Sequence, residues 1–191
     1  MIKLENQTDY IYGLHSVLEA IKSEKNISKI FLDKDKNYPK SFLSIVREKK
    51  ISLSYVPKVK IRSFSREVNQ GIVAIVSPVK FYKIEDIGFN GGNSDILILN
   101  SISDVRNLGA IIRSAECFGI KFIILDKKCA IINQDSMKAS SGAINYVKII
   151  RVENLKTSLI FLKERKIKII GCSEKSQNSI FETKLNHKVA F

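Results

Sequence analysis

The sequence predicts an α/β protein built from two successive series of alternating helices and strands. Amphipathic periods typical of helices alternate with short apolar runs typical of strands. The runs at residues 95–100 and 121–126 have the composition of strands buried in a parallel sheet. The chain's only Gly-Gly pair lies in a polar segment between the two series. We therefore expect a first domain at residues 1–80, a linker at 81–94 and a second domain at 95–191.

The first series predicts a compact domain. Apolar side chains recur at i, i+3, i+4 and i+7 from Leu14 to Ile21, which predicts a helix directly after Gly13. Cations near the end of a second helix suit its dipole, and a buried strand precedes Pro78. The remaining elements of this series follow in order: a strand at 27–32, a helix around Phe42, Ile45 and Val46, a strand at 51–56, a short helix or turn at 60–66, and the strand at 71–76.

The second series predicts a parallel sheet with crossover helices, because each strand is followed by a helical pattern. The final residues, Val189, Ala190 and Phe191, read as a strand that has just started. The elements expected after the strand at 95–100 are a helix at 107–118, a strand at 121–126, a short helix at 135–141, a strand at 147–152, a helix around Leu155, Leu159 and Leu162, and a strand at 166–173.

The charge indicates a polyanionic partner. The 191 residues include 32 Lys and Arg against 19 Asp and Glu, for a formal charge of +13. The excess is not a detachable tail, because residues 1–80 already hold 15 basic and 8 acidic side chains. A nucleic acid fits this balance. A compositional bias toward Lys, Ile and Asn is the alternative, and charge alone does not decide between them.

Several classes of protein are disfavoured by the sequence. Its apolar stretches are too short to span a bilayer and the N-terminus has no secretory signal, so we expect a cytoplasmic protein without a membrane partner. Three widely spaced cysteines suggest neither a disulfide framework nor a metal site. Neither a GxGxxG fingerprint nor a P-loop is present. The only histidines, His15 and His187, do not assemble a catalytic triad or metal site.

The segment that carries chemistry is residues 99–125, which read as strand, polar loop, helix, Gly119 and strand. Its loop delivers polar side chains, Asn107 among them, at the carboxyl end of a strand, where open α/β sheets form their sites. Arg113 interrupts a helix of small and apolar residues. Three alternatives follow for Arg113: it points into a functional cleft, pairs with an acid, or lies on a solvated helix face.

The motif NLGAIIRSAECFG, residues 107–119, strongly resembles the first motif of the SpoU/TrmH-type RNA ribose 2'-O-methyltransferases of the SPOUT superfamily. IYGLHSVLEAI and NQGIVAIVSP resemble the start and end of that family's N-terminal substrate-binding domain, which is built like a small ribosomal RNA-binding protein. KASSGAINYVKIIRV resembles the segment after the second strand of its catalytic domain. The two-domain arrangement is most similar to members that methylate a guanosine ribose in 23S rRNA.

The resemblance implies S-adenosyl-L-methionine as cofactor, RNA (most specifically 23S rRNA) as substrate, and a homodimer. It assigns activation of the ribose hydroxyl to Arg113, and we expect its protonated guanidinium to stabilise alkoxide charge. Asn107 matches the motif Asn and would fix the loop and contact the ribose, or only cap the helix. Cys172, Ser173 and Glu174 would line one edge of the methyl-donor pocket, or form a plain turn.

Family members continue past the position of Phe191 with a GSExxG loop and an IPM…SLNxS segment, which together form a trefoil knot that binds the methyl donor. We therefore expect residues 95–191 to be a methyltransferase domain truncated before the knot and lacking most of the cofactor site, with its activity alone left open. Whether it is a fragment or a natural truncation stays open. The alternative functions are a non-catalytic RNA-binding remnant and a tRNA ribose methyltransferase.

Overall fold

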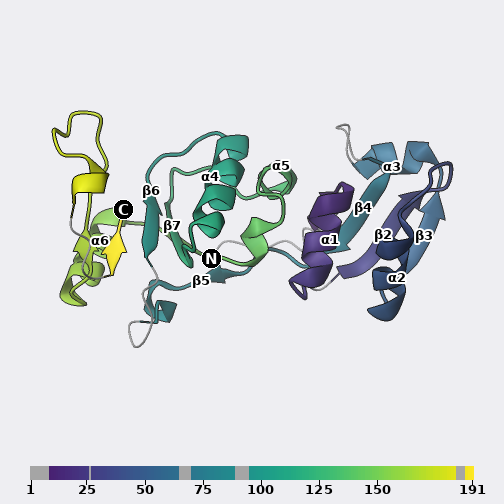
Figure 1. Cartoon of the computed structure of the whole chain (residues 1–191), viewed down its shortest axis with the longest axis horizontal. Coiled ribbons are helices and arrows are strands. Elements are labelled where there is room, and N and C mark those ends of the chain that lie inside the picture. The colour runs from purple at the N-terminus through teal and green to yellow at the C-terminus, as the bar shows by residue number, and fades with distance from the viewer. Residues whose placement is uncertain (1–8, 26, 65–69, 89–94, 184–187) are drawn as a thin grey trace. The chain divides into compact units, whose positions relative to one another are not determined.

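A computed structural model describes residues 9–25, 27–64, 70–88, 95–183 and 188–191 of the chain (Figure 1). The chain divides into two compact units, which we describe separately. Unit 1 comprises Met1–Val79, Val105–Arg113 and Ile131–Tyr146, and unit 2 comprises Lys80–Asp104, Ser114–Ala130 and Val147–Phe191. Each unit contains one β-sheet, so the predicted α/β class with two successive series is confirmed.

Unit 1 is built on a four-stranded sheet of order β1-β4-β2-β3. Strand β4 runs antiparallel to β1 and β2, whereas β2 and β3 are parallel. The strands and first three helices are β1 (Asp9–Tyr12), α1 (Leu14–Lys22), β2 (Ile27–Asp33), α2 (Lys40–Glu48), β3 (Leu53–Val56), α3 (Lys58–Phe64) and β4 (Ile72–Val76). These elements confirm the predicted order. Strand β1 was not predicted, because four residues are too few to establish an alternation.

The helices of unit 1 bury part of the apolar side that their sequence period predicts, whereas the predicted positions Leu14, Leu18 and Ile45 are half-buried. Val17, Ala20 and Ile21 of α1 are buried, as are Phe42 and Val46 of α2. Along the central strands Ile30 and Ala74 are fully buried. Burying an aliphatic side chain contributes about 1.5–3 kcal/mol, so this apolar layer is the main source of the unit's stability.

Gly71 lies in a turn directly before β4, and its carbonyl oxygen accepts from the N–H of Asp33 at the end of β2 (2.9 Å). Gly71 has a φ of +81°, and an added Cβ would lie 2.9 Å from the Tyr38 hydroxyl oxygen. The Tyr38 hydroxyl donates to the carbonyl oxygens of Asp33 (3.1 Å) and Gly71 (2.9 Å). Burial raises the pKa of Tyr38 to about 12. Glycine is therefore required here by the backbone and by the packing of Tyr38.

Unit 2 is built on a six-stranded, fully parallel sheet of order β5-β8-β7-β6-β10-β9, as predicted for the second series. Strand β9 is shorter than the predicted strand at 166–173, and α4 begins two residues before the predicted start at 107. The remaining strands and helices of the chain are β5 (Phe81–Tyr82), β6 (Ile96–Leu99), α4 (Val105–Cys117), β7 (Phe122–Asp126), α5 (Gln134–Ala139), β8 (Lys148–Val152), α6 (Leu155–Glu164), β9 (Lys168–Ile169) and β10 (Val189–Ala190).

Strand β10 lies between β6 and β9 and pairs with both. The N–H of Ile98 donates to the carbonyl of Phe191 (2.7 Å), and the N–H of Phe191 donates to Ile96 (2.9 Å). On the other side, the N–H of Ile170 donates to Ala190 (2.8 Å). Val189 and Ala190 are buried. The strand predicted from the last three residues is confirmed, and it connects β9 to the rest of the sheet.

The segment predicted as a linker, residues 81–94, begins with ordered structure. Strand β5 pairs with β8, and a 3-10 helix follows at Ile84–Asp86. Residues 89–94, which include the Gly-Gly pair, lie outside the described residues. Across the described part of the chain, every helix is too short or too polar to cross a membrane.

The loop after β7 is fixed at the carboxyl edge of this sheet. The Asp126 carboxylate accepts from the backbone N–H groups of Lys128 and Cys129. Arg151 at the end of β8 donates to the carbonyls of Cys129 (3.0 Å) and Ala130 (2.6 Å). The N–H of Ala130 donates to Ile102 (2.7 Å), in the loop that precedes α4. Arg151 therefore holds the β7 loop, which in turn holds the β6 loop.

We predict that Tyr38→Phe lowers the free energy of unfolding by about 1–2 kcal/mol at pH 9, because the carbonyls of Asp33 and Gly71 lose the hydroxyl that they share and keep only a backbone N–H donor each. Because the pKa of Tyr38 is raised in the folded state, the difference in unfolding free energy between the wild type and Tyr38→Phe depends on pH. Above pH 10 the unfolded chain loses the phenol proton first, so the wild type's advantage is lost as the pH rises from about 10 to 12. Urea unfolding at pH 9, 10 and 11 measures this narrowing. Tyr55→Phe, at an exposed tyrosine, is the control at pH 9. A difference in unfolding free energy between the wild type and Tyr38→Phe that stays constant to pH 11 would contradict the prediction.

We predict that Arg151→Met lowers the free energy of unfolding by about 1–3 kcal/mol, because two loop carbonyls lose a charged donor. Hydrogen exchange at the Ala130 amide should accelerate by about five-fold or more. Lys156→Met, at an exposed lysine of α6, removes the same charge elsewhere and should leave that exchange rate unchanged. Wild-type exchange at Ala130 in Arg151→Met would show that the guanidinium does not hold the loop.

Candidate active site

Helix α4 carries the two predicted catalytic residues on its exposed side. Asn107 and Arg113 are both exposed, whereas Leu108 and Ile112 are fully buried. A helix turns by about 100° per residue, so Arg106 and Arg113, seven positions apart, lie almost in line, whereas Asn107 projects about 100° further round the helix. The exposed surface of α4 therefore presents two guanidinium groups in line and an amide at an angle to them.

The surroundings of Arg113 reduce the alternatives for its role. Its side chain is exposed, and in the described part of the chain it forms no ion pair. Of the three alternatives, the pair with an acid is therefore not observed. An exposed guanidinium that is not neutralised can bind a phosphate or stabilise an oxyanion. Asn107 lies in the first turn of α4, directly after the loop that follows β6.

Gly109 permits α4 to approach α5 closely. A Cβ at this position would collide with the backbone carbonyl oxygen of Ser136 and lie 2.7 Å from the Cβ of Ala139. The facing end of α5 is fixed by its cap: the Asn133 side chain accepts from the N–H of Ser136 at 3.1 Å, and the Ser136 hydroxyl accepts from the N–H of Asn133 at 2.9 Å. Gly109, the small residue in the motif, therefore sets how closely α4 packs against α5.

The segment around α5 also contacts the first strand and first helix of unit 1. The Tyr12 hydroxyl donates to Asp135 at 2.6 Å, and the Lys138 ammonium lies 4.8 Å from the centre of the Tyr12 ring. The Tyr146 hydroxyl donates to Glu19 at 3.3 Å. Lys22, bonded to Glu19 at 2.7 Å, lowers the pKa of Glu19. The hydrogen bonds of Tyr12 and Tyr146 join residues more than 120 positions apart, and no local sequence pattern predicts them.

Cys172, Ser173 and Glu174 lie in an exposed turn after β9. The Ser173 hydroxyl accepts from the N–H of Lys175 at 3.2 Å, and its carbonyl accepts from the N–H of Ser176 at 3.1 Å. Because all strands of unit 2 are parallel, this turn emerges at the same edge as the loop after β6. It belongs to unit 2, whereas Asn107 and Arg113 belong to unit 1.

A small hollow of about 10 Å³, roughly the room that one water molecule needs, lies in unit 1, and none of the predicted site residues lines it. Ile11, Ser16, Met137 and Ile144 are among its walls. It is smaller than the 300–1,000 Å³ usual for small-molecule sites. In the described ranges, no group of three or more His, Cys, Asp or Glu side chains is arranged to hold a metal ion.

Arg151 is a structural residue at the carboxyl edge of the parallel sheet, and it was not predicted from the sequence. The available signal was an arginine within the apolar strand KIIRV, where a cation needs a partner. Its partners are backbone carbonyls of a loop more than twenty positions earlier, at Cys129 and Ala130. A backbone carbonyl has no sequence signature, so the pairing could not be predicted from residue types.

Two family models match the chain. Residues 95–191 match the SpoU rRNA Methylase family, and residues 10–82 match the model described as RNA 2'-O ribose methyltransferase substrate binding. The first match covers α4 and the whole parallel sheet except β5, and the second covers the sheet of unit 1.

Curated relatives agree with these matches. A Bacillus subtilis protein, YacO, named for the TrmH family of tRNA/rRNA methyltransferases, is 29% identical over 175 residues, which are 88% of this chain and 70% of the relative. A Staphylococcus haemolyticus protein of the same description is 32% identical over 168 residues, covering 84% of this chain and 68% of its own length.

Solved structures share the fold. The SpoU methyltransferase AviRb from Streptomyces viridochromogenes, in complex with the cofactor AdoMet, has a TM-score of 0.78 at 16% identity, over 95% of this chain and 71% of its own. An AdoMet-bound rRNA methyltransferase from Sinorhizobium meliloti has a TM-score of 0.77 at 18% identity, over 96% and 69%. The methylase model spans half of the sequence and the staphylococcal relative exceeds 30% identity, and so the chain belongs to the SpoU/TrmH family of RNA methyltransferases.

Proposed function

We propose that the protein transfers a methyl group from S-adenosyl-L-methionine to the 2'-hydroxyl of a ribose in RNA. The observation that carries the proposal is the exposed side of α4, where Asn107 and Arg113 lie within the family's first motif. The description of the substrate-binding model, which names 2'-O ribose methyltransferases, supports the ribose hydroxyl as the acceptor.

Arg113 stabilises the acceptor oxygen as it becomes negative. A ribose hydroxyl is a weak acid, so the site must hold it in line with the methyl group and lower the energy of the alkoxide. A guanidinium stays protonated in proteins and therefore acts as a cation rather than as a base. It also binds the phosphate next to the ribose, which fixes the nucleotide. Asn107 holds the loop after β6 and donates to the ribose.

S-adenosyl-L-methionine, when bound, supplies a methyl group on a positively charged sulfur. We assign one edge of its site to Cys172, Ser173 and Glu174. Their exposed turn at the carboxyl edge of a parallel sheet is the kind of position where open α/β sheets hold ligands. An added Cβ at Gly171 would meet nothing within 4 Å, so the turn leaves room beside it. AviRb, with its AdoMet, has the same fold.

We assign residues 1–80 to binding of the RNA substrate and 95–191 to methyl transfer, with 81–94 as the segment that connects them and that begins with β5. The match at residues 10–82 and the excess of basic side chains in the first domain support this division. The proposed target is a guanosine ribose in 23S rRNA, and the proposed assembly is a homodimer. Transfer RNA is the second candidate substrate, because the relatives are named for tRNA/rRNA methyltransferases.

We predict that Arg113→Ala reduces methyl transfer by about a hundred-fold or more, the effect of losing one group that stabilises an oxyanion. The Kd for RNA should change by less than about three-fold, because many basic side chains share the phosphate contacts. The assay follows labelled methyl from S-adenosyl-L-methionine into rRNA and, separately, into tRNA, with nuclease mapping of the product.

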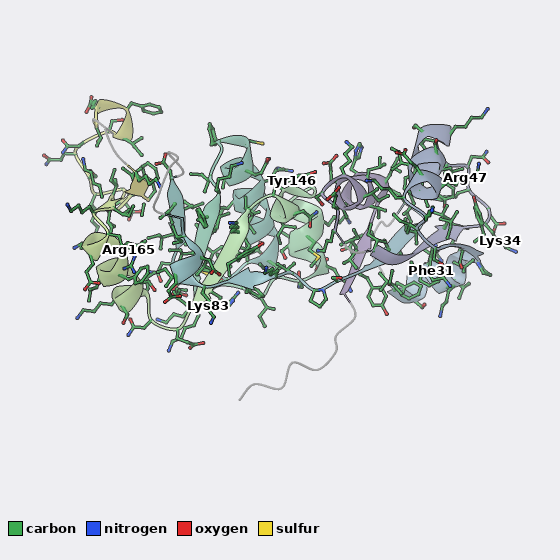
Figure 2. The ribbon with its side chains drawn as sticks, turned by 90° about the horizontal axis from the view of Figure 1, so that it is seen from below. Phe31, Lys34, Arg47, Lys83, Tyr146 and Arg165 are labelled. Atoms are coloured by element: carbon green, nitrogen blue, oxygen red, sulfur yellow. The ribbon has the colours of Figure 1, made fainter. Side chains whose placement is uncertain are left out.

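Arg165→Ala is the matched control, because Arg165 is an exposed arginine that lies over the Phe161 ring at the end of α6 (Figure 2). It should retain wild-type transfer. Near-wild-type turnover in Arg113→Ala would contradict the proposal that Arg113 stabilises the acceptor oxygen. RNA binding by the wild type without any methyl transfer would contradict the enzyme and support a non-catalytic RNA-binding protein.

A further inference from the structure

One face of the sheet in unit 1 carries an aromatic cluster beside lysines. In the strand register, Tyr10 and Lys29 both pair with Ile75, and Phe31 pairs with Val73. Paired residues point to the same side of a sheet, and alternate residues of a strand share that side. Tyr10, Lys29 and Phe31 therefore project from one face, and Phe31 is labelled in Figure 2.

Helix α3 adds a third ring to this face. Phe64 lies 5.0 Å from Phe31, centre to centre and nearly parallel, and 5.1 Å from Tyr10 at a tilt of 43°. All three rings are half-buried, whereas Ile61 of the same helix and Val73 beneath it are buried. The aromatic platform, which we define as Tyr10, Phe31 and Phe64, thus forms the accessible surface of a small apolar cluster.

Two ammonium groups lie at the rings. Lys29 Nζ is 5.3 Å from the centre of Phe31, and Lys60 Nζ is 5.2 Å from the centre of Phe64. In the described part of the chain, neither lysine forms an ion pair. Asp33 projects from the same face, but its side chain is 2% exposed and accepts from the N–H of Asp35. Positive charge therefore dominates what the described residues expose here.

We propose that the aromatic platform binds an unpaired base of the RNA substrate by stacking, with Lys29 and Lys60 on the flanking phosphates. Every base has a π-face, so aromatic side chains beside cations bind single-stranded nucleic acid with little sequence preference. The positive charge complements phosphate and disfavours a basic or lipid-tail partner. This inference rests on the proposed function only because it takes RNA as the substrate. It adds that the bound RNA is single-stranded at the platform.

The test is binding of the full chain to a short single-stranded RNA that contains 2-aminopurine, whose fluorescence falls when the base stacks. Phe31→Leu keeps an apolar side chain but removes the ring, and it should weaken binding by about ten-fold and abolish the fluorescence change. Lys29→Gln leaves the rings in place and should make the slope of log K against log salt less steep by about 0.7. Thermal unfolding verifies that Phe31→Leu is folded.

Tyr55→Leu is the matched control, because Tyr55 is 55% exposed and pairs with Leu32, so it projects from the opposite face of the same sheet. It should bind as the wild type does. Wild-type affinity and quenching in Phe31→Leu, or equally tight binding of a fully paired duplex, would overturn the platform while leaving RNA methylation intact. A wild-type chain that binds no RNA would overturn both proposals.

Discussion

The parallel sheet of unit 2 depends on two residues of β10. Strand β9 is bonded to no other strand of the described sheet, so Val189 and Ala190 connect it to β6. The hydrogen bonds of Ile98 and Ile170 to this segment satisfy backbone groups that would otherwise face an apolar interior. Because β10 fixes β9 parallel to β6, the turn that holds Cys172, Ser173 and Glu174 emerges at the same edge as the loop leading into α4. The position of one candidate binding loop is therefore a consequence of sheet pairing.

That edge is held together by cations and backbone groups. The Arg151 guanidinium bonds loop carbonyls, Asp126 bonds loop N–H groups, and the thiol of Cys129 lies 3.2 Å from the carbonyl oxygen of Leu99. Such a network suits a site that must position and electrostatically stabilise reactants. The candidate catalytic face of α4 also carries positive charge, because its exposed charged side chains, Arg106 and Arg113, are both guanidinium groups.

Local patterns could be predicted from the sequence, and contacts across the fold could not. The apolar pattern predicted the helix at 107–118, whereas the exposure of Arg113, left open among three alternatives, came only from the structure. The short apolar end of the chain predicted β10. The bond from Tyr12 to Asp135 spans 123 positions and depends on how α5 packs, which no local pattern encodes. The requirement for glycine at position 71 likewise depends on a distant contact, because Tyr38, 33 positions earlier, packs against it.

The division of the chain has a consequence for how binding energy is used. Interactions that are equally strong with the bound RNA and with the transition state improve binding without accelerating the chemical step. The stacking proposed at Phe31 and the phosphate contacts proposed for Lys29 are of this kind, since neither group would change its charge or partner as the methyl group moves. The role proposed for Arg113 differs, because the oxygen that it would face becomes negative only during the reaction. Loss of the ring should therefore raise KM, whereas loss of the guanidinium should lower kcat, and this contrast separates recognition by the sheet of unit 1 from chemistry at α4.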